Sequence, residues 1–328
     1  MISRRDLMQS GAGALIATAL GPVTAFAQAS DYPNKPIHAI CMFPPGSGAD
    51  IIVRFFAKKL SDVSGKTVIV ENKAGAFGNI ATEAVARSKP DGYTIYIAPG
   101  SSVFAAAKHL FTKLPFDPVS DFDHVTLIAR LPFVLIVNGD GPYKTVADLV
   151  ADLKQKGDKA SYGSVANTGL VGSELFKANF GLKTLEVKYK DPQAMLNDLY
   201  GGNLAFAHID PTGVMGQMAS GKVRALASTA AQRMKALPNI PSAKEAGIDN
   251  SDLTAWWSVH TPAKTDKAIL AKLETWFNAV ARDEEVAKYL ANLGVDPFPG
   301  DSATLNSLLK TDMEAWGRYV DLAKIEKL

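Results

Sequence analysis

The sequence of 328 residues contains a single cysteine, Cys41. One thiol cannot form a disulfide within the chain, which excludes the disulfide-stapled class of small exported domains. Cys41 also stands in an apolar run, residues 37–42. This context predicts a buried thiol that packs as a small hydrophobic side chain rather than a reactive one.

Histidine is scarce as well, with five in the whole chain, at positions 38, 109, 124, 208 and 260. None belongs to an HExxH motif or has a close neighbour at metal-ligand spacing. The sequence therefore predicts no metal site. His208 is the last residue of a predicted strand, and it is the one histidine to which we assign a binding role.

Neither charge sign is in excess, because 35 Lys and Arg oppose 33 Asp and Glu. No cluster of basic residues is long enough to follow a phosphate backbone, so nucleic acid is not an expected partner. Beyond the first thirty residues no apolar stretch approaches the roughly 20 residues that a spanning helix needs. We therefore expect no membrane-spanning segment after that point.

The first 29 residues have the pattern of an export signal. Arg4 and Arg5 precede a run of small and apolar residues, 11–20, and two overlapping Ala-x-Ala sites end at Ala27 and Ala29. We predict a signal peptide that is cleaved near one of these alanines, and hence a periplasmic protein. The arginine pair also resembles a twin-arginine signal, and the Sec route stays open as an alternative.

After the signal segment the chain alternates short apolar runs with amphipathic stretches, which predicts an α/β protein with parallel sheets. Roughly 300 mature residues exceed the size of one hydrophobic core, so we expect two such units. The predicted strands of the first unit are residues 37–42, 67–70, 94–98 and 125–129, with helices at 50–63 and 79–87. Those of the second are 133–137, 161–164, 185–189, 204–208 and 223–228, with a helix at 146–156.

The last third departs from this rhythm, because residues 254–259 are its only strand candidate and everything after Pro262 has helical spacing. These helices are expected to pack back on the first unit. The chain then crosses between the units twice, which makes a two-segment hinge. The predicted first lobe is residues 30–129 plus 253–328, and the second lobe is 130–252.

The most informative motif joins a predicted strand to a predicted helix through two prolines and two glycines. Glycine lets a turn expose its backbone N–H groups, and a helix N-terminus adds partial positive charge. We interpret the motif as a backbone pocket for a carboxylate. Its residues are Phe43, Pro44, Pro45, Gly46, Ser47, Gly48, Ala49 and Asp50.

Two enzyme classes fit poorly. A dinucleotide fingerprint would need a third glycine where Ile51 stands, although Glu71 lies about twenty residues beyond the turn. No serine completes the G-x-S-x-G elbow of an α/β-hydrolase. The sequence thus favours neither a dinucleotide-dependent oxidoreductase nor a serine hydrolase.

Polar loops follow several other predicted strands, and the carboxyl ends of strands are where α/β sheets usually bind ligands. An aromatic residue is included because it stands beside such a loop. The further candidate ligand-binding residues are Phe77, Ser101, Ser102, Ser164, Asn167, Thr168, Gly169, Asp191, His208 and Asp210.

In combination, these motifs resemble those of the receptors of tripartite tricarboxylate transporters, the Bug proteins. The resemblance implies a type II periplasmic-binding fold, a carboxylate held by the Pro-Pro-Gly loop, a membrane permease as partner, and neither catalysis nor cofactor. It rests on Tyr32-Pro33, Phe43 to Asp50, Val70-Glu71-Asn72-Lys73, Gly78-Asn79-Ile80, Pro90-Asp91-Gly92-Tyr93, Leu114-Pro115-Phe116-Asp117-Pro118, Gly221-Lys222-Val223-Arg224 and Leu237-Pro238-Asn239-Ile240-Pro241.

The sequence departs from the family pattern mostly in the second half. Ala205 replaces a usual acid, Leu170 and Val171 stand in a loop that is usually rich in serine, and Phe77 replaces a usual glycine. A ligand ammonium would want a carboxylate partner, so we disfavour amino acids and favour an aromatic or weakly polar carboxylate over citrate-like triacids.

Two alternatives to a transport receptor stay open: a sensory receptor that presents its ligand to a signalling partner, and an exported enzyme of the same fold. A monomer is the simplest expectation for a protein that closes about a hinge.

Overall fold

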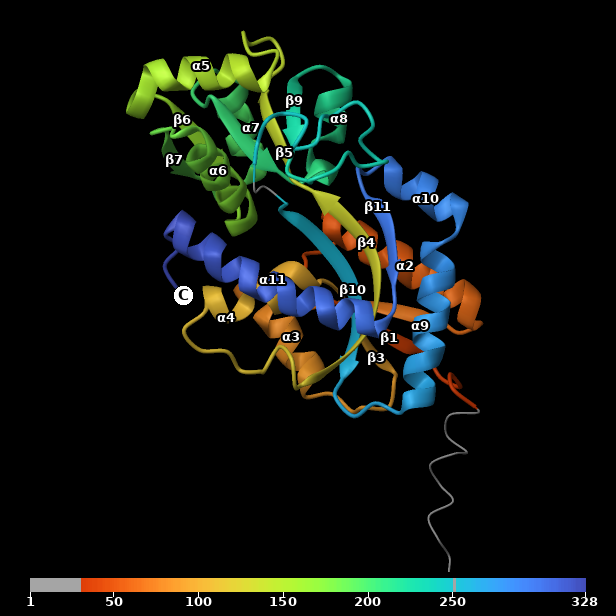
Figure 1. Ribbon diagram of the computed structural model, residues 1–328. Helices are drawn as coiled ribbons and strands as arrows, with labels where there is room; N and C mark the ends of the chain where they lie inside the picture. The colour runs from red at the N-terminus through yellow and green to blue at the C-terminus, as the bar shows by residue number, and fades with distance from the viewer. Residues whose placement is uncertain (1–30, 250–251) are drawn as a thin grey trace, which may run out of the picture. The chain divides into compact units, whose positions relative to one another are not determined.

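The computed structural model describes residues 31–249 and 252–328, and residues 33–328 form one unit. The predicted signal peptide, residues 1–29, lies outside the described part. Two sheets organise the unit (Figure 1), as the predicted α/β fold requires.

The first sheet is mixed, with strand order β11-β4-β10-β3-β1-β2. Three of its strands are parallel, and β10 runs antiparallel to both β3 and β4, which corrects the expectation of a wholly parallel sheet. Its strands are β1 (Ile37–Cys41), β2 (Val68–Asn72), β3 (Thr94–Pro99), β4 (Phe122–Pro132), β10 (Thr254–Pro262) and β11 (Asp296–Gly300).

Strand β11 is the element of the last third that the sequence did not predict. The segment contains Pro297 and Pro299, which cannot donate to a ladder and which we had expected in a helical region. Proline is tolerated on an edge strand, and β11 pairs only with β4, so it forms one edge of the sheet.

Helices cover the first sheet because their apolar residues recur on one face. In α2 the side chains of Ile52, Val53, Phe56 and Leu60 are buried. The helices are α2 (Gly48–Ser64), α3 (Asn79–Ala86), α4 (Ala107–Leu110), α9 (Lys267–Ala281), α10 (Glu284–Ala291) and α11 (Ser302–Ala323), with short turns η1 (Ala76–Gly78) and η2 (Ser101–Ala105).

The second sheet, of order β7-β6-β8-β5-β9, is also mixed, because β5 runs antiparallel to both of its neighbours. Its strands are β5 (Val134–Asn138), β6 (Ser161–Ser164), β7 (Leu185–Lys188), β8 (Phe206–Ile209) and β9 (Val223–Ser228). Its helices are α5 (Val146–Lys156), α6 (Asn167–Phe180), α7 (Pro192–Tyr200) and α8 (Met215–Ala219), with turns η3 (Gly157–Lys159) and η4 (Pro211–Gly213).

Side chains alternate along β5 and so build two cores. Leu135 and Val137 enter the cluster on the side of α5 and α6, while Val134 and Ile136 enter the cluster that contains the buried residues of α7. A strand with both faces buried must be apolar at every position, and β5 reads Val-Leu-Ile-Val before Asn138. We call the two sheets with their helices the first and second lobes.

The helices after Pro262 follow the expectation only in part. Helix α9 packs against β4 and α2 of the first lobe, as predicted. Helix α11 packs against β4 but also against α6, and Ala323 and Ile325 join a core cluster of the second lobe. The last helix therefore joins the two lobes (Figure 1).

The two segments that cross between the lobes run side by side. Strand β4 ends at Pro132, which pairs with Thr254 at the start of β10, and a single residue, Phe133, separates β4 from β5. The buried Thr229 hydroxyl accepts a hydrogen bond from the Phe133 N–H at 2.9 Å and donates one to the Leu253 carbonyl at 2.6 Å. One side chain thus ties both crossings together.

We expect Thr229→Val to lower the free energy of unfolding by about 2 kcal/mol, because it leaves a buried donor and a buried acceptor without partners. Thr229→Ser keeps the hydroxyl and should lose less than half as much. Urea unfolding of the two variants measures the difference, and equal losses would show that the hydroxyl is not the tie.

Candidate functional site

A cavity of about 500 Å³ lies between the lobes and is lined by residues of both. We call it the interlobe cavity. Its walls come from the segments after β1, β3 and β8 and from the start of α6, which is where polar loops were expected. The predicted site residues that line it are Phe43, Pro44, Ala49, Phe77, Ser101, Ser102, Asn167, Thr168, Gly169, His208 and Asp210.

The other predicted site residues do not line this cavity. Ser164 donates a hydrogen bond to Glu186, and Asp191 caps α7 by accepting the N–H groups of Gln193 and Ala194. These contacts are structural. The predicted residues outside the lining are Pro45, Gly46, Ser47, Gly48, Asp50, Ser164 and Asp191.

Asp50, in the first turn of α2, fixes the Pro-Pro-Gly loop through hydrogen bonds. Its buried carboxylate accepts hydrogen bonds from the Gly46 N–H at 2.8 Å, from Arg54 Nε at 2.8 Å and from Asn72 Nδ2 at 2.7 Å. Burial by itself raises the pKa of Asp50, but the hydrogen bonds from Arg54, Asn72 and Gly46 outweigh it and lower the pKa. Asp50 is therefore a brace for the loop, and it does not contact the cavity.

The contacts of Asp50 correct the predicted backbone pocket. Gly46 has the positive φ, +82°, that requires glycine, but its N–H is already bound to Asp50. Ser47 caps α2, since its hydroxyl accepts the Asp50 N–H at 3.2 Å. Within the described part, the N–H groups of Gly48 and Ala49 in the first turn of α2 have no hydrogen-bond partner. Of the predicted pocket, the amides of Gly48 and Ala49 rather than that of Gly46 are therefore available to a ligand.

A second helix begins at the cavity from the opposite lobe. Helix α6 follows Ala166, which supplies no side-chain cap, and Asn167, Thr168 and Gly169 of its first turn line the cavity. A Cβ at Gly169 would stand 2.6 Å from the His208 carbonyl oxygen, so only glycine fits there. Two helix N-termini with partial positive charge therefore contribute to the lining.

Two titratable side chains of β8 and its end line the second-lobe wall. His208 is buried against Ser173, and burial lowers its pKa to about 3, which keeps the ring neutral. Burial raises the pKa of Asp210, even though its Oδ1 accepts hydrogen bonds from the Thr212 N–H and hydroxyl at 2.8 and 2.7 Å. Asp210 is the only charged residue among those that line the cavity, and none is Lys or Arg.

Much of the cavity wall was not predicted from the sequence. Met42, Phe111, Phe133, Trp257 and Trp316 line it in addition to the predicted residues. Trp257 lies within β10, and Trp316 comes from α11, far along the chain from any strand end. A rule based on strand ends cannot find residues that a distant helix contributes.

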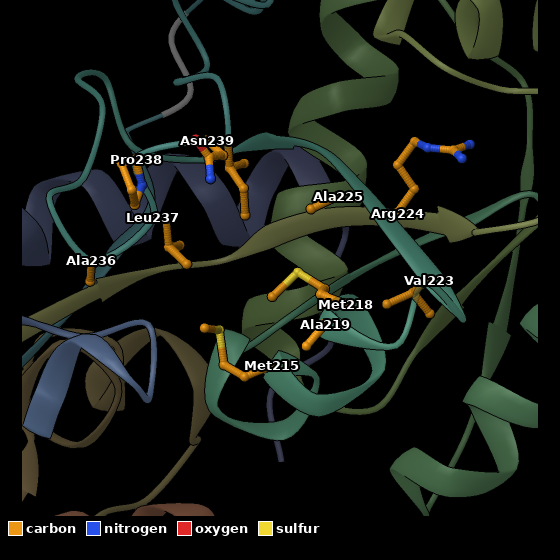
Figure 2. A pocket seen from close by; sticks show the side chains of 12 residues that line it. Met215, Met218, Ala219, Val223, Arg224, Ala225, Ala236, Leu237, Pro238 and Asn239 are labelled. Carbon is orange, nitrogen blue, oxygen red and sulfur yellow. The ribbon is translucent and has the colours of Figure 1, made fainter.

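Another pocket, of about 460 Å³, lies in the second lobe beside α8 and β9. Figure 2 shows Met215 and Met218 on one side of it and Leu237, Pro238 and Asn239 on the other. It is nearly as large as the interlobe cavity, but the helix that begins at it, α8, has only five residues, and none of the predicted site residues lines it. Volume alone therefore does not identify the site. The amides at the N-termini of α2 and α6 favour the interlobe cavity.

The described residues contain no group of three or more His, Cys, Asp or Glu side chains that could hold a metal ion. Over the same residues, no helix is both long enough and apolar enough to cross a membrane.

Comparisons with known proteins identify the family. The family profile described as tripartite tricarboxylate transporter family receptor matches residues 52–325. The chain is 32% identical to the protein of the TAR-I ttuE-ttuC' intergenic region of Agrobacterium vitis, over 90% of this chain and 87% of that protein.

Solved structures agree with the family match. Rpa4515 of R. palustris with adipate has a TM-score of 0.80 and 29% identity, covering 91% of this chain and all of that one. The periplasmic binding protein BugD has a TM-score of 0.76 and 28% identity, covering 90% of this chain and all of its own. These likenesses confirm the two-lobed α/β fold that the sequence predicted.

Proposed function

This chain belongs to the receptor family of tripartite tricarboxylate transporters, the Bug proteins, and we propose that it binds one small organic carboxylate in the interlobe cavity and delivers it to the membrane permease subunits of such a transporter. The observation that carries the proposal is the pair of helix N-termini, α2 from the first lobe and α6 from the second, whose first turns line one cavity. A carboxylate accepts hydrogen bonds from such amides and is favoured by both helix dipoles.

A buried hydroxyl supports the same assignment. Ser101 lines the cavity, is 3% exposed, and its Oγ has no hydrogen-bond partner among the described residues. A buried hydroxyl without a partner is unfavourable, and a carboxylate oxygen would satisfy it. The adipate bound to Rpa4515 supports a carboxylate rather than another anion.

The proposal includes a mechanism of capture. Residues 30–129 plus 253–328 and residues 130–252 would act as two bodies that close about the crossings near Phe133 and Leu253. Phe133 belongs both to a crossing and to the cavity wall, so a ligand that packs against it also acts on the hinge. The closed, liganded form is the one that a permease would recognise.

We also propose that the protein is periplasmic after loss of residues 1–29, that it acts as a monomer, and that it neither catalyses a reaction nor carries a cofactor. BugD, to which it is similar, is described as a periplasmic binding protein. A receptor needs only a binding and a closing step.

Thermal unfolding with a panel of carboxylates tests the proposal. A ligand present at 100 times its dissociation constant stabilises the folded state by about 2.7 kcal/mol, which shifts the melting temperature measurably. We expect at least one organic carboxylate to do so while inorganic sulfate and amines do not. Failure of every carboxylate to shift the melting temperature would overturn the proposed function.

Asp210 predicts how binding depends on pH. Because burial raises its pKa, Asp210 loses its proton at a higher pH than an exposed aspartate does. The ionised carboxylate then repels an anionic ligand. Affinity for a carboxylate should therefore be highest below this raised pKa and fall as the pH rises through it, by at most about tenfold per pH unit for one linked proton. Asp210→Asn should bind more tightly than the wild type above that pH and lose the dependence.

Calorimetric titrations with adipate between pH 5 and 8 measure this dependence. Asp191→Asn is the control, because Asp191 caps α7 and does not line the cavity. A profile of Asp210→Asn that matches that of the wild type would show that Asp210 does not face the ligand.

A further inference from the structure

The wall of the interlobe cavity in the first lobe is aromatic. Phe43 and Trp257 pair with ring centroids 5.9 Å apart, and Phe77 and Phe111 pair at 6.1 Å. All four line the cavity, together with Phe133 and Trp316. The second lobe presents aliphatic groups such as Val165 and Ile209. The cavity thus offers ring faces and ring edges from one side.

Phe77 is the most unusual member of this wall. Its φ of +53° lies in the left-handed region, which glycine tolerates and a phenylalanine adopts only at a cost. The side chain is also 63% exposed, so an apolar ring faces solvent at the cavity. Unfavourable backbone and unfavourable exposure at one residue are typical of a functional position. A ligand that covers the ring removes the second cost.

The charges of the wall limit the ligand further. No Lys or Arg lines the cavity, and Asp210 adds a carboxylate to it. Among the described residues that line the cavity, the two helix N-termini are then the only positive groups, which suits one or two ligand carboxylates and disfavours a triacid. Asp210 also corrects part of the sequence argument, because an acid does line the cavity even though position 205 is alanine. The aromatic wall, rather than the loss of an acid, is what specifies the ligand.

From these observations we infer that the ligand is a carboxylate carried on an aromatic ring, with the carboxylate at the N-terminus of α2 or α6 and the ring packed against Phe77. This inference rests on the proposed function and names the class of carboxylate. Aromatic rings pack face to edge or offset against other rings, and a saturated body of equal size gains only its buried area. Phe77 is then the residue that determines specificity.

Two matched pairs of acids test the inference by calorimetry: benzoate against cyclohexanecarboxylate, and terephthalate against adipate. Each pair has equal charge and similar size; the first pair differs in aromaticity, and the second differs in aromaticity and also in rigidity, because adipate is an open chain. We expect each aromatic acid to bind about tenfold more tightly than its saturated partner. Trp257 and Trp316 line the cavity, so quenching of intrinsic fluorescence provides a second readout.

Phe77→Gly is the informative variant, because glycine adopts this φ without strain and the fold should be preserved or stabilised. It should lower the affinity for terephthalate about tenfold and change that for adipate less than threefold. Ile80→Ala is the control, since Ile80 is an exposed apolar residue three positions away that does not line the cavity. Its affinities should equal those of the wild type.

The outcomes separate this inference from the proposed function. Binding of adipate with no binding of either aromatic acid, equal affinities within both pairs, or an aromatic preference that survives in Phe77→Gly would overturn the inference alone. If neither these four acids nor any other carboxylate bound, both the inference and the proposed function would be wrong.

Discussion

Gly48→Val is expected to weaken carboxylate binding by about 100-fold or more while the protein stays folded. A Cβ at Gly48 would stand 3.1 Å from the Thr212 hydroxyl oxygen, across the contact between the lobes, and a valine side chain is larger still. It would hold the lobes apart and cover the amides of the first turn of α2. Losing those hydrogen bonds to a charged group costs about 1.5–3 kcal/mol each.

Two variants separate these causes. Ser47→Ala removes the cap of α2 but not the free amides, so it should lower stability by about 1 kcal/mol and leave the affinity almost unchanged. Thr212→Ala in the Gly48→Val background removes the nearest atom and should recover part of the affinity if steric separation dominates. Undiminished affinity in a folded Gly48→Val protein would refute the assignment of α2 to the site.

Asp50→Asn is expected to lower the free energy of unfolding by about 2–3 kcal/mol at neutral pH. The amide cannot accept the three hydrogen bonds that the buried carboxylate receives from Gly46, Arg54 and Asn72 with the same strength. It should also weaken ligand binding, because the Pro-Pro-Gly loop loses its brace.

The lowered pKa of Asp50 fixes the sign of the pH dependence. A carboxyl group whose pKa is lower in the folded state stabilises the fold above its unfolded pKa, and this stability is lost as the pH falls through the folded pKa. The difference in the free energy of unfolding between the wild type and Asp50→Asn should therefore become smaller as the pH is lowered. Urea unfolding at several pH values measures it, with Asp62→Asn as the control on the same helix, where an exposed pair with Lys58 is worth little. A difference in unfolding free energy that stays constant at all pH values would contradict the claim that the ionised Asp50 carboxylate stabilises the loop.

The sequence predicted the α/β class, most strands and the crossing of the chain between two units, because buried strands such as β5 are apolar at each buried position. It did not predict strand direction, since β10 and β3 pair through residues that are far apart in sequence and carry no directional pattern. It missed β11, whose two prolines argue against an interior strand but are compatible with an edge.

For the site, the rule that ligands bind where strands end found Ser101, Asn167 and Asp210, which do line the cavity. It counted the Gly46 amide with those of Gly48 and Ala49 in the backbone pocket, because sequence reasoning cannot show that a side chain four residues later, Asp50, already binds the Gly46 N–H. Trp316 could not be predicted from the sequence for another reason, because only the tertiary packing of α11 brings it to the cavity.

The most direct test of the central claim is a crystal structure of the chain without residues 1–29, grown with whichever of adipate and terephthalate binds more tightly. We predict a carboxylate oxygen within hydrogen-bonding distance of the Gly48 or Ala49 amide, with the body of the ligand against Phe77. A ligand bound outside the interlobe cavity, for example beside Met215 and Leu237, would contradict the account.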